Sequence, residues 1–302
     1  MQAPTSQRLR VLDESQVEFY RTNGYLLLES FVPADWLKRL VDASNEFVEE
    51  SRSLTAADRR LDIEPDHTAE NPRLRRLTSP VDHHETFAEF TLSGPVVDVA
   101  LDLVGAPARY HHSKLNYKWS QGGGAVQWHQ DIQYWPHSDF TPLTIGVYLA
   151  DVDDEMGPMG IIPGSHTGTL FDLYDDNGDW TGRIRDEDLP SIDLEAVDWL
   201  TGPAGSITVH NCGSVHGSMP NNSGRVRPLL LQTYSAADSY PLLGVGTNGL
   251  GGGFVGNHSG RLVGGSDAPR SLTIDGRRMC AAPDWSRGGY TTIFDVQAEN
   301  ER

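Results

Sequence analysis

The sequence contains few cysteines, few basic residues and no long hydrophobic run. Its 302 residues include two cysteines, Cys212 and Cys280, which are too few for a disulfide framework and do not form a Cys-x-x-Cys pair. No stretch reaches the roughly 18 consecutive apolar residues of a membrane-spanning helix. The N-terminal residues lack the apolar core of a signal peptide. We therefore expect a cytoplasmic protein that does not span a membrane.

Basic residues are scarce relative to acidic ones. The chain has 24 Lys and Arg against 42 Asp and Glu, a formal net charge of −18. This charge repels phosphate backbones and anionic lipid surfaces, so we expect a small-molecule substrate and neither nucleic acid nor a membrane as a partner. We interpret the one basic cluster, Arg73, Arg75 and Arg76, as a solvated face, with a local anion contact as the alternative. The sequence leaves the oligomeric state open.

The pattern of apolar residues differs between the first third of the chain and the rest. The first third shows helical periodicity at 14–22, 33–51 and 96–104, with a strand-length run at 25–29 and a polar, irregular segment at 53–80. Later, short β-like runs alternate with turns rich in Gly, Pro, Asn and Asp, which is typical of a barrel or sandwich. The expected strands are 108–119, 125–134, 143–151, 159–162, 206–210, 226–235 and 290–295.

These patterns predict a mainly β fold with flanking helices and a single domain over residues 1–302. The helical flank covers about 14–105, and the β core covers about 107–240 and 288–296. The acidic segment 165–200 is expected to be a lid-like insertion between strands. The stretch Gly244–Gly249 matches G-x-G-x-x-G, but more glycines follow it where a dinucleotide site needs a helix, so we interpret it as a surface loop.

His129 and Asp131 lie two positions apart in an apolar run of strand character. Residues i and i+2 of a strand share a face, so an imidazole and a carboxylate can converge there on one ion. A third ligand is available downstream as His210 or His216. Two histidines and one carboxylate form a facial triad with open positions, which suits non-haem Fe(II). Arg227, or Arg225 in its place, could hold a carboxylate as a bidentate pair.

Three motifs in this order resemble the phytanoyl-CoA dioxygenase family of Fe(II)- and 2-oxoglutarate-dependent oxygenases, which have a double-stranded β-helix (jelly-roll, cupin-like) core. The resemblance implies that His129, Asp131 and His216 are the catalytic iron ligands, with O2 as a further cosubstrate. The motifs are Trp128-His-Gln-Asp131, Gly157-Pro-Met-Gly-Ile-Ile-Pro-Gly-Ser-His166 and His216-Gly-Ser-Met-Pro-Asn-Asn-Ser-Gly-Arg-Val-Arg227.

The same resemblance implies a cosubstrate site and one substrate contact. Arg227 would pair with the distal carboxylate of 2-oxoglutarate, with Ser218 beside it. Further expected contacts to the cosubstrate are Asn116, Lys114 and Gln127. Trp135 resembles an aromatic residue that lines the substrate side in ectoine hydroxylases, although the ectoine signature after it is absent.

The resemblance favours hydroxylation of an unactivated C–H bond, with release of succinate and CO2. Halogenating relatives have a small residue at the position of Asp131, which frees a site for a halide ion. In this chain the Asp131 carboxylate fills that site, so hydroxylation is favoured over halogenation. Desaturation and ring closure stay open as alternative reactions. The chain lacks a basic cradle for an acyl-CoA, so we expect a small metabolite, such as an amino-acid derivative or a secondary-metabolism intermediate. Two alternatives remain. One is a cupin-like metal-dependent isomerase or hydrolase that does not use 2-oxoglutarate and would not need Arg227. The other is a non-catalytic jelly-roll binding module.

Overall fold

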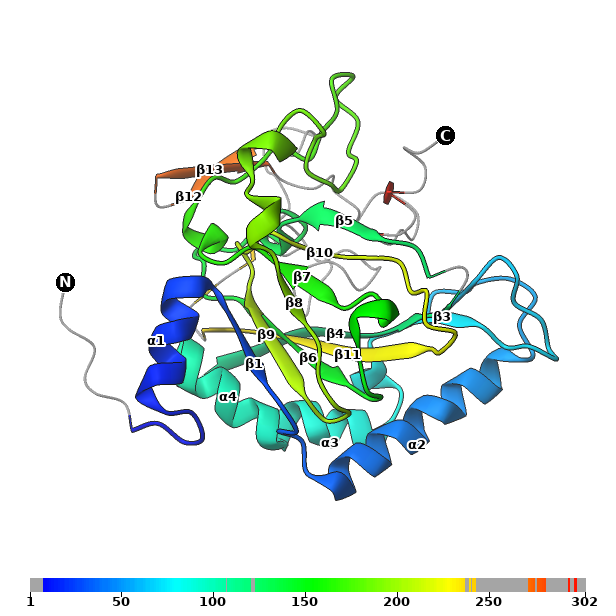
Figure 1. Cartoon of the computed structure of the whole chain (residues 1–302). Coiled ribbons are helices and arrows are strands. Elements are labelled where there is room, and N and C mark those ends of the chain that lie inside the picture. The colour runs from blue at the N-terminus through cyan, green and yellow to red at the C-terminus, as the bar shows by residue number, and fades with distance from the viewer. Residues whose placement is uncertain are drawn as a thin grey trace, which may run out of the picture.

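Two β-sheets that face each other form the centre of the molecule (Figure 1). The larger sheet has seven strands in the order β1-β9-β6-β11-β4-β3-β2, and the smaller has four in the order β5-β10-β7-β8. The computed structural model describes residues 8–106, 108–120, 123–236, 239, 241–242, 271–274 (backbone only), 276–280, 293 and 296–297.

Neighbouring strands in both sheets are antiparallel. The larger sheet contains β1 (Tyr25–Leu28), β2 (Leu61–Ile63), β3 (Leu74–Thr78), β4 (Ala108–Lys118), β6 (Leu143–Tyr148), β9 (Ile207–Asn211) and β11 (Arg227–Ala236). The smaller sheet contains β5 (Val126–His129), β7 (Met159–Ile161), β8 (Asp198–Leu200) and β10 (His216–Ser218), and a separate pair is formed by β12 (Ser271–Ile274) and β13 (Arg277–Cys280).

Local sequence explains where the helices begin and end. Helix α1 starts with a capping box, in which the Asp13 carboxylate accepts from the Gln16 N–H and the Gln16 side chain accepts from the Asp13 N–H. It ends at Gly24, whose φ of 80° suits glycine. Among the described residues, no helix is both long enough and apolar enough to cross a bilayer. The helices are α1 (Glu14–Asn23), α2 (Ala34–Ser51), α3 (Glu85–Ser93) and α4 (Pro95–Val104).

The helices cover the outer face of the seven-stranded sheet (Figure 1). The alternation of apolar and polar side chains along β4 shows how the sequence produces this arrangement. Leu115 and Tyr117 join Phe90 of α3 in the hydrophobic core under the helices. Lys114 and Asn116, on the other face of the strand, line a cavity between the sheets. The sheet is therefore apolar toward the helices and polar toward the interior of the jelly roll.

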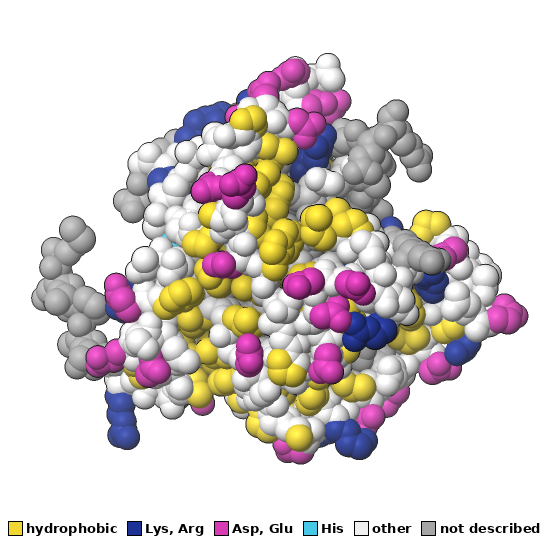
Figure 2. Space-filling model, in the orientation of Figure 1, with side chains coloured by type: hydrophobic (Ala, Val, Ile, Leu, Met, Phe, Trp, Pro, Cys, Tyr) yellow, Lys and Arg dark blue, Asp and Glu magenta, His cyan; other side chains and the backbone are white. Residues whose placement is uncertain are grey.

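The acidic composition is visible at the surface. Figure 2 shows Asp and Glu side chains spread over the face in view, among hydrophobic and neutral ones. Several cations are instead buried: Arg76, Lys118 and Arg227 are only 3%, 4% and 4% exposed. Burial of a charge is costly unless it is paired, so these positions call for a functional explanation.

The expected jelly-roll fold with a helical N-terminal third is confirmed, but the expectation for 53–80 was wrong. That segment contains β2 and β3, which extend the larger sheet beyond β4. Leu61, Leu74 and Leu77 are fully buried. The sequence pattern missed these strands because they are short and rich in charged residues. The idea that Arg73 and Arg76 form a solvated face is also wrong, since both are at least nine-tenths buried.

Other boundaries differ more locally. The expected strand 125–134 ends at His129, and the 3-10 turn η2 (Asp131–Gln133) follows. Helix α3 and the short strands β8 and β10 were not expected. Of the expected strand 290–295, only Ile293 is described, and it is helical. The remaining 3-10 turns are η1 (Pro80–Asp82), η3 (Asp154–Met156), η4 (Ser165–Thr167), η5 (Leu189–Ser191) and η6 (Leu194–Ala196).

The insertion 165–200 packs near the smaller sheet. The Ile184 N–H donates to the carbonyl of Trp128, at 2.8 Å, and β8 pairs with β7. None of the residues 165–200 lines the cavity between the sheets. The role of this segment as a lid and the assignment of one domain both stay predictions. The Gly244–Gly249 loop lies outside the described residues.

Candidate functional site

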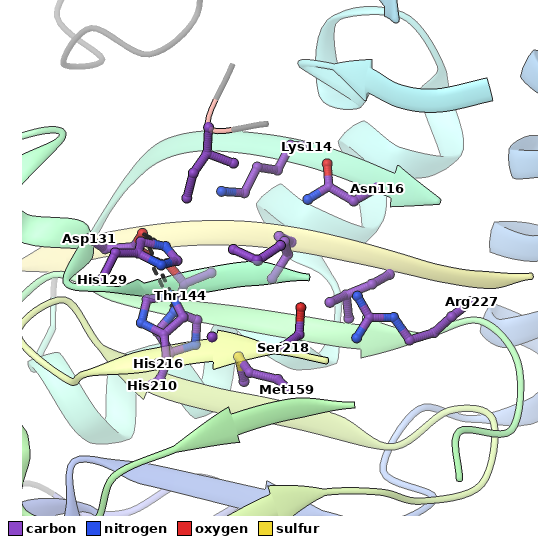
Figure 3. Close-up of a pocket in the computed structure, with 15 residues that line it drawn as sticks. Lys114, Asn116, His129, Asp131, Thr144, Met159, His210, His216, Ser218 and Arg227 are labelled. Carbon is purple, nitrogen blue, oxygen red and sulfur yellow. Dashed lines mark hydrogen bonds and ion pairs between the residues drawn. The ribbon is translucent and has the colours of Figure 1, made fainter. Parts of the chain in front are cut away.

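A cavity between the two sheets contains most of the predicted site residues. Figure 3 shows His129, Asp131, His210 and His216 clustered at one end of it and Arg227 at the other. The larger sheet contributes Lys114, Asn116, Thr144, His210, Arg227, Leu229 and Leu231, the smaller sheet and its flanks contribute Val126, His129, Asp131, Met159, His216, Gly217 and Ser218, and Ile293 completes the lining.

The predicted metal ligands meet at the first end. His129 on β5 and His216 on β10 are paired directly across the two strands, and their ring centroids lie 4.2 Å apart. Asp131 Oδ1 is 3.7 Å from His129 Nε2 and 3.9 Å from His216 Nε2. One ligand atom from each residue lies within 4.8 Å of the other two. All three side chains are buried, so they form a compact donor set for a metal ion.

The way in which His129 and Asp131 converge differs from the expectation. We predicted that both residues would lie on one face of the same strand. Instead β5 ends at His129, and Asp131 begins the 3-10 turn η2. The Ile132 N–H donates to the carbonyl of Cys212, at 2.8 Å, which ties the turn to the segment between β9 and β10. The turn, rather than strand alternation, brings the carboxylate to the imidazole.

Hydrogen bonds set the tautomers of the two histidines. The Nδ1 atom of His129 is 2.8 Å from the Gln127 carbonyl, and the Nδ1 atom of His216 is 3.0 Å from the Ser214 carbonyl. A carbonyl oxygen only accepts, so each Nδ1 is the protonated nitrogen and each Nε2 has a free lone pair. Both Nε2 atoms are directed at Asp131, as metal ligation requires.

Burial keeps the two imidazoles neutral. It lowers the pKa of His129 to about 4, although the Asp131 carboxylate acts in the opposite direction. Burial also lowers the pKa of His216 well below its usual value. For Asp131, burial alone would raise the pKa, but His216 and a hydrogen bond from His210 hold it well below its ordinary value. The site therefore offers two neutral nitrogens and one carboxylate, the protonation states that bind a metal.

His210 was the alternative to His216 as third ligand, and the structure gives it a different place. Its Nε2 lies 3.3 Å from Asp131 Oδ2, the oxygen that does not face the other two histidines. His210 lies outside the group of converging ligand atoms. It is therefore positioned to orient the carboxylate, as outer-shell groups commonly do at metal sites.

A buried cationic pair lies at the other end of the cavity, where Arg227 is part of the lining and Lys118 contacts the lining residue Ser218. Arg227 on β11 and Lys118 on β4 are directly opposite each other in the strand register. The Lys118 Nζ donates to Ser218 Oγ and to the Met219 carbonyl, each at 2.6 Å. Arg227 Nη1 donates to the Gly157 carbonyl at 2.6 Å, and its buried Nε has no partner. Burial, with the charge of Arg227, lowers the pKa of Lys118 well below its usual value.

Arg225 was the alternative anion clamp. It lies at the surface, where it is paired with Asp153, and both side chains are about half exposed. It does not line the cavity, whereas Arg227 does. The structure thus brings Arg227 and Ser218 together in the lining of the cavity and leaves Arg225 outside.

The other predicted site residues divide into two groups. Lys114 and Asn116 line the cavity, and Asn116 Oδ1 is buried without a partner. Gln127 and Trp135 do not line it. The Gln127 N–H donates to Gln297 Oε1, at 3.0 Å. Trp135 is buried, with its ring centroid 5.3 Å from that of His111. The suggested cosubstrate contact of Gln127 and substrate contact of Trp135 stay predictions that this geometry does not support.

Sequence reasoning missed Lys118 and the role of His210. The spacing Lys114, Asn116, Lys118 contained the necessary information, because alternate residues of one strand share a face. Once Lys114 and Asn116 are placed on the face of β4 that lines the cavity, Lys118 follows on the same face, although it is not itself part of the lining.

Comparison with known proteins identifies the family. The family described as "Phytanoyl-CoA dioxygenase (PhyH)" matches residues 20–229, which is more than half of the chain. This chain belongs to the phytanoyl-CoA dioxygenase family. The match includes β5, η2 and β10, the elements that hold the three candidate metal ligands.

Individual relatives agree with this family assignment. The chain is 32% identical over 232 residues to the "Probable alpha-ketoglutarate-dependent hypophosphite dioxygenase" of Stutzerimonas stutzeri, covering 76% of this chain and 81% of the relative. It is 31% identical over 186 residues to "L-proline trans-4-hydroxylase" of Streptomyces griseoviridis, covering 56% and 69%. Its fold resembles that of EctD from S. alaskensis with bound Fe, at 24% identity and a TM-score of 0.62, covering 74% and 77%.

The enzyme class expected from the sequence is confirmed. This protein is a non-haem iron dioxygenase that depends on 2-oxoglutarate and O2. The jelly-roll fold is shared with solved oxygenase structures. The two alternatives, a metal-dependent isomerase or hydrolase that does not use 2-oxoglutarate and a non-catalytic binding module, do not agree with these relatives, which are named as a dioxygenase and a hydroxylase.

Proposed function

We propose that this enzyme hydroxylates an unactivated C–H bond of a small metabolite, with His129, Asp131 and His216 as the iron ligands and Arg227 as the anchor of 2-oxoglutarate. One observation supports the assignment most strongly. A converging set of two neutral imidazoles and one carboxylate shares a cavity with Arg227, a buried guanidinium that forms no salt bridge in the described part of the chain. Iron and a dicarboxylate would together satisfy both ends.

The donor chemistry at the first end fits Fe(II). Two imidazole nitrogens and one carboxylate oxygen lie on one side of the potential ion, which leaves other positions free for ligands. Each imidazole is oriented by a hydrogen bond from its other nitrogen to a backbone carbonyl. Replacing a ligand would therefore remove metal binding without removing the hydrogen bonds that hold the other histidine.

The second end fits the distal carboxylate of 2-oxoglutarate. Arg227 and Lys118 are both buried, and in the described part of the chain neither forms a salt bridge. The unpartnered Nε of Arg227 has a donor available for a carboxylate oxygen. Ser218 Oγ, already bonded to Lys118, lies at the same end of the cavity. Asn116 lies farther along β4, where its unpartnered Oδ1 is available to a polar ligand.

When bound, iron and 2-oxoglutarate together supply the oxidation of the C–H bond by O2, with release of succinate and CO2. The protein's own residues provide binding, orientation and a dry environment. Asp131 and the two neutral imidazoles hold the metal, His210 orients the carboxylate of Asp131, and Leu229 and Leu231 make part of the cavity wall apolar.

The names of relatives support the proposed substrate class. The names of two relatives refer to hypophosphite and L-proline, which are both small. We therefore propose a small free metabolite rather than a carrier-bound one. We also propose a cytoplasmic location, in agreement with the two buried, unpaired cysteines.

An anaerobic titration of the purified apoprotein with Fe(II) and 2-oxoglutarate tests this proposal. We expect a visible metal-to-ligand charge-transfer band in the wild type and none in His216→Ala. A His83→Ala variant, which changes an exposed histidine, should keep the band. Absence of the band in the wild type, with Fe(II) shown to bind, would refute the assignment of 2-oxoglutarate to this cavity.

A further inference from the structure

Residues near the C-terminus reach the candidate active site. After residue 280 the structure describes Ile293, Val296 and Gln297. Ile293 is part of the cavity lining, and Val296 and Gln297 are buried, with 8% and 4% of their surface exposed. A glutamine buried this deeply needs hydrogen-bond partners for its carboxamide. The partners of Gln297 therefore show what holds these residues against the cavity.

The carboxamide of Gln297 bridges two distant parts of the chain. Its Oε1 accepts from the backbone N–H of Gln127 on β5, 170 residues earlier, at 3.0 Å. Its Nε2 donates to the carbonyl of Gly182, in the insertion 165–200, also at 3.0 Å. Because a backbone N–H only donates and a carbonyl oxygen only accepts, only this orientation of the carboxamide satisfies both groups. Gln297 therefore ties the strand that carries His129 to the insertion.

Strand β5 needs such a partner because it is an edge strand. It is the first in the order β5-β10-β7-β8, so β10 covers only one of its sides (Figure 1). Buried backbone groups on the other side of an edge strand must find partners outside the sheet. The N–H of Gln127 finds one in Gln297, and the carbonyl of Trp128 finds one in the Ile184 N–H, at 2.8 Å. The side chain of Gln297 thus takes the place of a neighbouring strand.

The backbone of Gln127 also orients a candidate metal ligand. Its carbonyl is 2.8 Å from His129 Nδ1, the contact that fixes the tautomer of this histidine. A second path leads through Gly182, whose carbonyl accepts from the Tyr134 hydroxyl at 2.5 Å. The Tyr134 ring in turn lies edge-on to the ring of His129, with their centroids 5.7 Å apart. Both hydrogen bonds of Gln297 therefore lead to His129.

The backbone at Gly182 permits this arrangement. Its φ is 65°, in the left-handed region that favours glycine. A Cβ atom at this position would lie 2.2 Å from the hydroxyl oxygen of Tyr134 and 3.1 Å from Cγ1 of Val296. A side chain here would push away Tyr134 or the C-terminal residues. Glycine therefore allows one carbonyl to accept from Tyr134 and from Gln297 together.

From these contacts we propose that Gln297 is a positioning residue of the metal site: its carboxamide holds the backbone of Gln127, and that backbone orients His129. The proposal rests on the function proposed above, in which His129 is an iron ligand. Loss of a group that orients a ligand weakens metal binding by about 10–100-fold. Gln297 acts through one further residue, so we expect a loss near the lower end of that range.

Hydrogen exchange and anaerobic Fe(II) titration of the purified apoprotein together test the proposal. Gln297→Met keeps an unbranched side chain of similar length but removes both hydrogen bonds. We expect the amide of Gln127 to exchange about tenfold faster in this variant, and Fe(II) to bind about tenfold more weakly. Gln297→Glu keeps an oxygen that accepts from the Gln127 N–H and should restore part of both properties. Asn222→Ala, which removes an exposed carboxamide, is the matched control.

Other results overturn the proposal at distinct points. If the Gln127 amide exchanges as slowly in Gln297→Met as in the wild type, Gln297 does not hold β5. If exchange is faster but Fe(II) affinity is unchanged, Gln297 holds the strand without positioning His129. Exchange in β6, which lies between β9 and β11, should stay at the wild-type rate, and faster exchange there would indicate general destabilisation instead.

Failure of the proposed function is distinguishable from failure of this inference. If the wild type itself binds no Fe(II), the metal assignment fails. The exchange rate of the Gln127 amide does not depend on metal, so it still decides whether Gln297 holds β5.

Discussion

The two sheets of the jelly roll contribute different chemistry to one cavity. The smaller sheet and the turn after it provide the candidate metal ligands, His129, Asp131 and His216. The larger sheet provides buried cations from three of its strands, including Arg76 and Arg227. The first group is neutral or anionic and the second is positive, although the protein as a whole has a net charge of −18.

This difference shows what each sheet is built to bind. The histidines of the smaller sheet have fixed tautomers and converge on one point, as a cation requires. Arg76 and Arg227 of the larger sheet have unpartnered Nε atoms, as expected where an anion is to be bound. A substrate or cosubstrate that spans the cavity would contact both groups. Single substitutions in one sheet or the other therefore test whether the two groups bind different ligands.

Removal of the carboxylate from the metal site should have the largest effect. Asp131→Ala leaves two neutral histidines and no anionic ligand, so we expect turnover to fall by at least about 100-fold, more than the loss typical of outer-shell residues. The measurement is succinate formation, together with Fe(II) affinity. Asp42→Ala, at an exposed position on α2, serves as the control. Full turnover by Asp131→Ala would remove the triad assignment.

A substitution in the larger sheet should affect 2-oxoglutarate and leave the metal in place. We expect Arg227→Gln to weaken the binding of 2-oxoglutarate by about 10–100-fold, the range for a lost charge-assisted hydrogen bond in a buried site. The Fe(II) affinity should be that of the wild type. Titration of the charge-transfer band at several concentrations of 2-oxoglutarate separates the two quantities. A parallel loss of Fe(II) binding would show that the two ends of the cavity are not independent.

The smallest effect is expected on stability, at the outer end of the larger sheet. Burial raises the pKa of Glu64, just after β2, to about 7, although Arg75 and Arg73 act to lower it. The unfolded carboxyl loses its proton near pH 4. The wild type therefore loses stability as pH rises from about 4 to 7, and the loss is complete above 7.

Glu64→Gln should remove this penalty. At pH 8 we expect the variant to be more stable than the wild type by about 1–2 kcal/mol, a conservative conversion of the pKa shift. Near pH 4 the difference should vanish. Chemical denaturation at several pH values measures it, with Glu18→Gln on the exposed face of α1 as control. A difference that does not depend on pH would contradict the raised pKa.

The sequence by itself determined the fold class and the metal site to a large extent. Apolar alternation such as that of β4 indicated strands, and the linked motifs ending at Asp131, His166 and Arg227 indicated the family. These features are local: each depends on the spacing of a few residues within one element or turn, which the sequence displays directly.

Only the tertiary structure decided how the site is assembled. The choice of His216 over His210 depends on which strand lies beside β5, and the approach of Asp131 depends on a turn that begins after the strand ends. The burial of Arg76 depends on β3 pairing with β4, a contact between segments distant in sequence. A charged residue in a short strand has the same local pattern whether it faces water or a cavity, so its environment is set by long-range strand pairing.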